Sequence, residues 1–103
     1  MTDALAGRAV LITGPARGIG EGLARALAAR GARLALVGLE PERLAALAAA
    51  LGEGHAWFAC DVTRQDALLH AVDGTVAALG GIDVVVANAG VASNGTVAVT
   101  PAE

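Results

Sequence analysis

Three closely spaced glycines occur in residues 13–20, which read Thr13-Gly14-Pro15-Ala16-Arg17-Gly18-Ile19-Gly20. The segment before them, residues 8–13 (RAVLIT), is aliphatic without strict alternation, which is typical of a parallel strand covered on both faces. From Gly18 onward, apolar residues recur at helical spacing until Gly31, which occupies the usual place of a helix C-terminal glycine. A strand that turns through glycines into a helix is how α/β proteins hold the phosphates of a nucleotide. A tight strand–helix connection without a ligand remains the alternative.

The rest of the chain continues this alternation of strand and helix. We predict further strands at residues 33–38, 55–60 and 83–87. A second helix starts with Pro41 in its first turn and stops at Gly52. A third helix is predicted from a capping box of Thr63 and Asp66, with an apolar stripe at Leu69, Val72, Val76 and Leu79. Short connections in this order predict an α/β fold, a Rossmann-type doubly wound parallel sheet in three α/β/α layers that ends after its fourth strand.

The last four residues, 100–103 (TPAE), have the pattern of a helix start, with Pro101 at the first helical position. A sheet that ended before this helix would leave an apolar parallel strand uncovered at one edge. We therefore interpret residues 1–103 as the N-terminal part of a single nucleotide-binding domain and expect further polypeptide after it.

The amino-acid composition argues against nucleic acid, membrane and metal as binding partners. The 103 residues are 55% hydrophobic and 17% charged, with a formal net charge of -3. This balance excludes the basic patch that nucleic-acid binding requires. The longest apolar runs fall far short of the ~20 residues that span a bilayer, so we expect a cytoplasmic protein without a membrane partner. The single cysteine, Cys60, and the two histidines, His55 and His70, lack the spacing of metal ligands, and we predict no metal site.

Two further motifs lie at predicted strand ends. Asp61-Val62 follows the third strand, and Asn88-Ala89-Gly90 follows the fourth. Together with a threonine and glycines spaced as in residues 13–20, these motifs resemble the short-chain dehydrogenase/reductase family. The resemblance extends from about residue 8 to residue 103. It implies an NAD(P)-dependent oxidoreductase that transfers a hydride between nicotinamide and a small alcohol or carbonyl substrate.

The resemblance also implies a role for each motif. It assigns the cofactor pyrophosphate to Gly14, Gly18, Ile19 and Gly20. Asp61 would accept from the adenine amino group while Val62 packs on the ring. The floor beneath the cofactor ribose would be formed by Asn88, Ala89 and Gly90. Asp61 can alternatively be read as the N-cap of the third helix, and Asn88 as a turn former only.

The choice between NAD and NADP stays open. In NAD-binding relatives a carboxylate after the second strand holds the ribose 2′-hydroxyl, but this chain has Gly38 and Leu39 there. Arg17 is placed as in relatives that neutralise a 2′-phosphate, whereas Glu40 lies close enough in sequence to repel one. We expect that either cofactor binds.

The family's catalytic Tyr and Lys are absent from this sequence, because tyrosine is missing and all seven basic residues are arginine. The only serine, Ser93, comes too early in the chain to be the family's catalytic serine. We therefore assign no catalytic residue to residues 1–103. The family resemblance implies a homo-oligomer, and a non-catalytic nucleotide-binding module or sensor is the alternative function.

Overall fold

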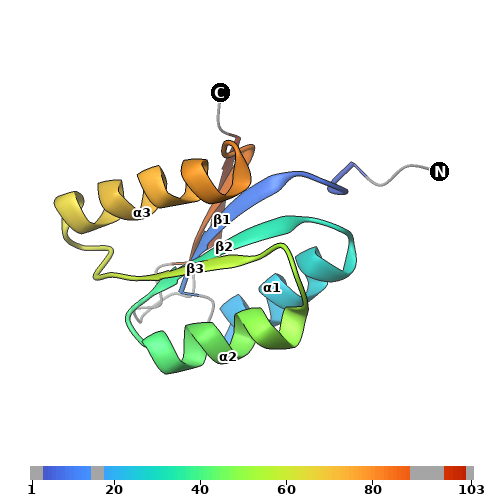
Figure 1. The fold of residues 1–103 in the computed structure, drawn as a ribbon, viewed down its shortest axis with the longest axis horizontal. Coiled ribbons are helices and arrows are strands. Elements are labelled where there is room, and N and C mark those ends of the chain that lie inside the picture. The colour runs from blue at the N-terminus through green and yellow to red at the C-terminus, as the bar shows by residue number, and fades with distance from the viewer. Residues whose placement is uncertain (1–3, 15–17, 89–96, 102–103) are drawn as a thin grey trace.

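The computed structural model describes residues 4–14, 18–88 and 97–101. Strands and helices alternate along these residues as far as the fourth strand (Figure 1). The elements are β1 (Ala9–Thr13), α1 (Gly18–Ala29), β2 (Arg33–Gly38), α2 (Pro41–Leu51), β3 (Ala56–Ala59), α3 (Gln65–Leu79), β4 (Val84–Asn88) and β5 (Val97–Pro101).

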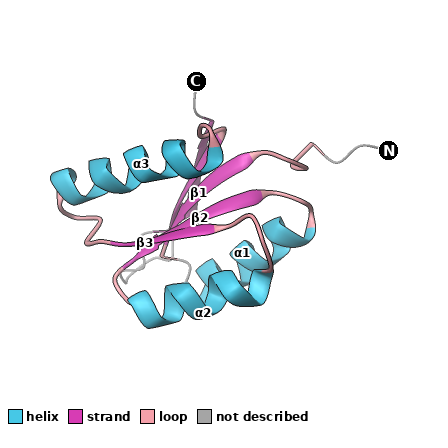
Figure 2. Ribbon diagram, in the orientation of Figure 1, coloured by secondary structure: helices cyan, strands magenta, loops and turns pink. Residues whose placement is uncertain are grey.

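The strands form one sheet in the order β3-β2-β1-β4-β5. The first four are mutually parallel, and β5 runs antiparallel to β4. Helices α1 and α2 cover one face of the sheet and α3 covers the other (Figures 1 and 2). The predicted three-layer, doubly wound parallel architecture is therefore confirmed.

The end of the described chain differs from the prediction. Thr100 and Pro101 lie in β5 and do not begin a helix, while the other two residues of the predicted helix start lie outside the described residues. The β-branched residues of this segment pair with β4, with Val99 opposite Val86. Strand β4 would otherwise leave its backbone groups unpaired at the edge of the sheet, and this requirement outweighs the local helix-start pattern. The sheet thus continues past its fourth strand.

Side chains of the central strands are buried alternately on the two faces of the sheet. The side facing α1 and α2 is formed by Val10, Ile12, Leu34, Leu36 and Val86. The side facing α3 is formed by Ala9, Leu11, Ala35 and Val37. Because both faces are covered, both sets are apolar, which explains why β1 and β2 show no polar alternation.

Helix α3 packs on the sheet through smaller residues than the predicted stripe. Leu69 and Val76 are 55% and 46% exposed, so two of the four predicted positions are wrong. The buried positions are Ala71, Thr75 and Leu79. The Thr75 hydroxyl donates to the Ala71 carbonyl at 2.7 Å, which satisfies the buried polar atom. Small side chains on this face allow close approach of the helix to the sheet.

The amino ends of the strands are joined by polar contacts. The Arg33 guanidinium donates to the carbonyl oxygens of Gly7 at 3.1 Å and Leu79 at 2.7 Å, so it also caps the C-terminus of α3. At the same end, Asp83 Oδ2 accepts from the Ala9 amide at 2.8 Å. These contacts join the amino end of the sheet to α3. The loops that follow the strands lie at the opposite, carboxyl end.

The imidazole of His55 joins the start of β3 to β2. Its Nδ1 atom accepts from the Leu34 amide at 3.0 Å. Burial lowers the pKa of His55 below its ordinary value, and a hydrogen bond with the Leu51 backbone opposes that shift. A protonated Nδ1 cannot accept this hydrogen bond, so the folded state favours neutral imidazole.

We expect the chain to lose stability as the pH falls below about 6.5, the ordinary histidine value. In that range the unfolded chain binds a proton at His55 that the folded chain does not, so acidification favours unfolding. Urea unfolding followed by circular dichroism at several pH values measures this slope. The slope should diminish in His55→Asn, whose amide oxygen replaces Nδ1 as acceptor, and persist in His70→Gln. An unchanged slope in His55→Asn would contradict this assignment.

Candidate functional site

The carboxyl ends of β1, β2 and β3 lie side by side because these strands are neighbours and parallel. Backbone hydrogen bonds join the segments that leave them. The Gly14 amide donates to the Val37 carbonyl at 2.9 Å, and the Cys60 amide donates to the Gly38 carbonyl at 2.7 Å. Strand β4, which ends at Asn88, is the other neighbour of β1. The described residues of the three predicted motifs therefore lie at one edge of the sheet, where open α/β sheets bind their ligands.

The turn between β1 and α1 depends on glycine at two described positions. Gly14 has φ of 70° and Gly18 has φ of 55°, both in the left-handed region that glycine adopts without strain. Apart from its chain neighbours and the backbone of its own helix, no described residue has an atom within 4 Å of where a Cβ at Gly18 would be. Gly20 is buried at the start of α1. Arg17, between the two turn glycines, lies outside the described residues.

Two large apolar side chains near this edge are exposed. Ile19, in the first turn of α1, is 65% exposed, and Leu39, directly after β2, is 69% exposed. Apolar side chains with this much exposure are common in ligand-binding sites, where a bound molecule covers them. Both are residues that the sequence assigns to the cofactor site.

Asp61, directly after β3, is oriented by Thr63. Its Oδ1 atom accepts from the Thr63 amide at 2.9 Å and from the Thr63 hydroxyl at 2.6 Å. The hydroxyl and then the amide of Thr63 lower the pKa of Asp61 below its ordinary value. Both donors thus favour the ionised form of the Asp61 carboxyl.

This geometry corrects the predicted start of α3. The N-cap is Arg64, without a side-chain capping hydrogen bond, so neither a Thr63–Asp66 capping box nor Asp61 as N-cap is present. Asp66 instead contacts Arg64 at 3.2 Å. The Asp61 carboxylate, two residues before Thr63, is an acceptor within reach and stronger than the neutral groups of a helix end. The Asp-x-Thr spacing was the signal for this turn.

The segment after β2 carries opposite charges beyond Gly38. Glu40 is the N-cap of α2, and Pro41 takes the first helical position, as predicted. The Arg43 guanidinium lies 3.6 Å from Glu40 Oε2. The negative charge of Glu40 is therefore partly balanced by Arg43. The sequence analysis considered Glu40 alone.

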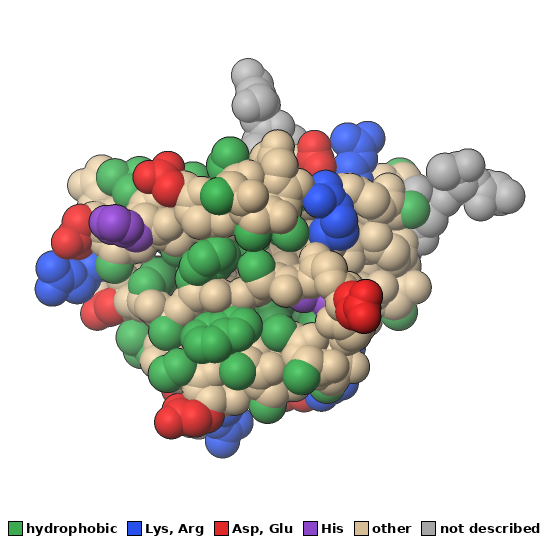
Figure 3. Space-filling model, viewed as in Figure 1, with side chains coloured by type: hydrophobic (Ala, Val, Ile, Leu, Met, Phe, Trp, Pro, Cys, Tyr) green, Lys and Arg blue, Asp and Glu red, His purple; other side chains and the backbone are tan. Residues whose placement is uncertain are grey.

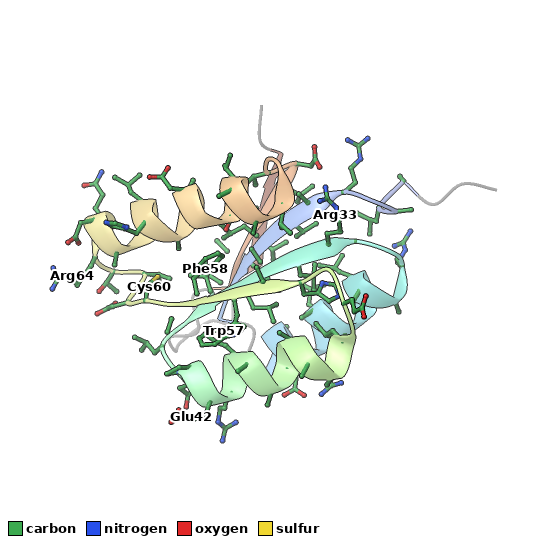
Figure 4. The ribbon with its side chains drawn as sticks, viewed as in Figure 1. Arg33, Glu42, Trp57, Phe58, Cys60 and Arg64 are labelled. Atoms are coloured by element: carbon green, nitrogen blue, oxygen red, sulfur yellow. The ribbon has the colours of Figure 1, made fainter. Side chains whose placement is uncertain are left out.

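A hollow of about 640 Å³ lies elsewhere, along β3 and the first half of α3. It is lined by Trp57, Phe58, Ala59, Cys60, Arg64, Asp66, Ala67, His70 and Ala71. Apolar side chains gather on this face between α2 and α3, with Trp57 directed toward α2 and Phe58 toward α3 (Figures 3 and 4). Burial raises the pKa of the Cys60 thiol, which stays protonated at neutral pH. None of the predicted site residues lines this hollow.

Within the described ranges 4–14, 18–88 and 97–101, no three His, Cys, Asp or Glu side chains are placed to hold a metal ion. Among the same residues, no helix is long and apolar enough to cross a membrane.

A family model described as short chain dehydrogenase matches residues 8–103. The chain belongs to the short-chain dehydrogenase family. It is 46% identical over 91 residues to a D-threitol dehydrogenase of Mycolicibacterium smegmatis, covering 85% of this chain and 35% of that protein.

Solved structures of the family show the same fold. An L-sorbose reductase from Gluconobacter frateurii, complexed with NADPH and L-sorbose, is 33% identical with a TM-score of 0.84 and covers 93% of this chain and 38% of its own. A 3-ketoacyl-(acyl-carrier-protein) reductase from Brucella melitensis, complexed with NADH, is 28% identical with a TM-score of 0.77; the match covers 80% of this chain and 34% of that one. The present short-chain dehydrogenase sequence spans about a third of the length of these relatives.

Of the predicted site residues, the structure places a first group around the carboxyl edge of the sheet. This group comprises Gly14, Gly18, Ile19, Gly20, Gly38, Leu39, Asp61 and Val62. The backbone of Asn88 ends β4 beside β1. Ala89 and Gly90, like Arg17, lie outside the described residues.

Proposed function

We propose that this chain supplies the dinucleotide-binding part of an NAD(P)-dependent oxidoreductase acting on an alcohol or carbonyl substrate. The observation that carries the proposal is the glycine turn between β1 and α1. Strand β1 lies between β2 and β4, whose helical connections run on opposite faces of the sheet. This reversal creates the crevice in which doubly wound folds bind dinucleotides. The relatives crystallised with NADPH and NADH support this proposal.

The pyrophosphate binds at the N-terminus of α1 in this proposal. Amide groups of the first turn have no partner within the helix, and the helix dipole adds positive potential there. Gly14 and Gly18 permit the turn and the close approach of the backbone, while Gly20 allows α1 to lie against the sheet. Ile19 covers the cofactor from its exposed position, and Arg17 supplies a positive charge.

The adenosine half extends across β2 and β3. Asp61 accepts from the adenine amino group and Val62 packs on the ring. The backbone at Gly38 and Leu39 lies beside the adenosine ribose in this proposal, and neither residue offers it a carboxylate. On the other side of β1, Asn88, Ala89 and Gly90 form the floor beneath the nicotinamide-side ribose.

The bound nicotinamide supplies hydride chemistry, and this chain's residues bind and orient it. Proton transfer to the substrate oxygen needs a group such as tyrosine with a neighbouring cation, because tyrosine near pKa ~10 is a poor base at neutral pH. Residues 1–103 contain neither tyrosine nor lysine, so this proposal requires that group to come from outside them. The cytoplasmic location, the single domain and the homo-oligomer stay predictions.

Titration of the chain with NADH and NADPH, followed by nicotinamide fluorescence, tests the proposal. Saturable binding of either cofactor is expected. Lack of saturation at about 1 mM, an affinity too weak to matter in cells, would overturn it. A non-catalytic sensor is the second candidate, favoured by the absence of tyrosine and lysine. Hydride transfer to simple ketones by the full-length protein distinguishes the two, since a sensor binds cofactor without turnover.

We expect the dissociation constants of NADH and NADPH to differ by less than about tenfold, or 1.4 kcal/mol. Gly38 offers no carboxylate to select the 2′-hydroxyl of NADH. The Glu40 carboxylate would repel the 2′-phosphate of NADPH. The Arg43 guanidinium, 3.6 Å from that carboxylate, would attract the same phosphate. Parallel calorimetric titrations with the two cofactors measure the ratio. A clear preference for one would show that another residue sets specificity, and Arg43→Ala would then test whether that residue is Arg43.

A further inference from the structure

Thr63 has a hydroxyl that the start of α3 does not use. Helix α3 has Arg64 at its N-cap, and the Arg64 side chain makes no capping hydrogen bond. The Thr63 hydroxyl instead donates to Asp61 Oδ1 at 2.6 Å, and the Thr63 amide donates to the same atom at 2.9 Å. Both donors of one residue therefore converge on one carboxylate oxygen.

The second oxygen of that carboxylate is left available. Within the described part of the chain, no residue donates a hydrogen bond to Asp61 Oδ2. The Asp61 carbonyl is also held, because it accepts from the Arg64 amide at 2.9 Å. The loop after β3 is thus arranged so that Asp61 has a set side-chain rotamer, with one oxygen bound internally and one presented outward.

We propose that Thr63 is a positioning residue for adenine recognition, holding the Asp61 carboxylate so that Oδ2 faces the exocyclic amino group. This inference rests on the proposed function, in which Asp61 contacts adenine. Thr63 does not touch the cofactor in this arrangement. It removes the rotational freedom that Asp61 would otherwise lose when the dinucleotide binds, and such preorganisation increases affinity.

Electrostatics agree with this geometry. An amino group donates best to an ionised carboxylate, since charge-assisted hydrogen bonds are about twice as strong as neutral ones. The Thr63 hydroxyl is the largest cause that lowers the Asp61 pKa. The hydroxyl that orients the carboxylate therefore also favours its ionised form, the better acceptor.

The test compares NADH with its hypoxanthine analogue, in which a ring carbonyl replaces the amino donor. Dissociation constants are measured by fluorescence titration for the unmodified chain, Thr63→Val and Thr63→Ser. Valine keeps the shape and the backbone amide of Thr63 and removes only the hydroxyl, while serine restores it. Circular dichroism melting of each variant confirms that the fold is retained.

The unmodified chain and Thr63→Ser should bind NADH about tenfold more tightly than the analogue, because one hydrogen bond to a charged group distinguishes the two ligands. In Thr63→Val the affinity for NADH should fall about threefold to tenfold, the cost of ordering one free side chain, while affinity for the analogue stays nearly unchanged. A role of Thr63 in folding alone would weaken both ligands equally.

The failures of the two proposals are distinguishable. Discrimination by Thr63→Val equal to that of the unmodified chain would overturn the role of Thr63 and leave dinucleotide binding standing. Equal affinity of the unmodified chain for NADH and its analogue would also overturn the role of Thr63, because Asp61 would then not recognise the adenine amino group. If the unmodified chain bound neither ligand, the proposed function itself would fail, and this inference with it.

Discussion

Replacement of Gly18 by alanine is expected to weaken binding of NADH and NADPH by about tenfold to a hundredfold, the loss of one charge-assisted hydrogen bond. Gly18 begins α1 with φ of 55°, and no described atom lies near its missing Cβ. The added methyl group would therefore enter the space through which the backbone approaches the pyrophosphate in our proposal. A Cβ also disfavours this left-handed conformation by about 1–2 kcal/mol. Calorimetric titration measures the loss.

Gly22→Ala, one turn later on α1, provides the matched control. Gly22 is exposed, its φ lies outside the left-handed region, and nothing lies within 4 Å of its Cβ position. Its replacement should leave cofactor affinity unchanged. Equal affinity of Gly18→Ala and the unmodified chain would mean that the glycine turn does not hold the cofactor.

Replacement of Gly74 by alanine should destabilise the fold by about 1–2 kcal/mol, although alanine is the better helix former. Gly74 lies inside α3, and a Cβ there would be 2.5 Å from Phe58 Cε1 and 2.9 Å from Phe58 Cζ. The aromatic ring packs against the α3-facing cluster of the core and is directed toward that helix (Figure 4). The ring must move away to make room and loses those contacts. Urea unfolding followed by circular dichroism measures the change.

A double-mutant cycle with Phe58→Leu assigns this cost to the ring. Leucine lacks the ring atoms nearest Gly74, so alanine at residue 74 should be neutral or stabilising in that background. The control Gly22→Ala, in open space on α1, should stabilise the chain by about 0.5–1 kcal/mol through helix propensity alone. If Gly74→Ala had the same effect with Phe58 as with leucine there, the proposed steric contact would be absent.

Helix propensity alone therefore gives the wrong sign for the effect of alanine at residue 74. Helix propensity depends on the residue itself, and on that basis alanine is better by about 1 kcal/mol. Phe58 is sixteen residues away in sequence and belongs to another element, so its contact with Gly74 exists only after β3 and α3 have packed. Local sequence patterns therefore cannot predict that contact.

In the cofactor site, too, some features were predictable from the sequence and others depended on the tertiary structure. The glycine motif and Asp61-Val62 could be placed from the sequence, because short strand–helix connections carry them to the carboxyl edge of any parallel sheet. The pairing of Thr63 with Asp61 was assigned instead to helix capping, since both arrangements satisfy the same short-range spacing. The position of the first residue of α3 separates them, and helix ends are not defined by periodicity to a single residue.

Strands β1–β4 and helices α1–α3 were predictable from local pattern, because hydrophobic periodicity and glycine or proline at the boundaries act within a few residues. The parallel order followed from connection length and handedness. Tertiary structure decided which side of α3 is buried, that Phe58 occupies the space above Gly74, and that residues 97–101 pair as β5 beside β4. Each of these depends on surfaces contributed by segments distant in sequence, whose packing and unpaired backbone groups outweigh local preference once the sheet has formed.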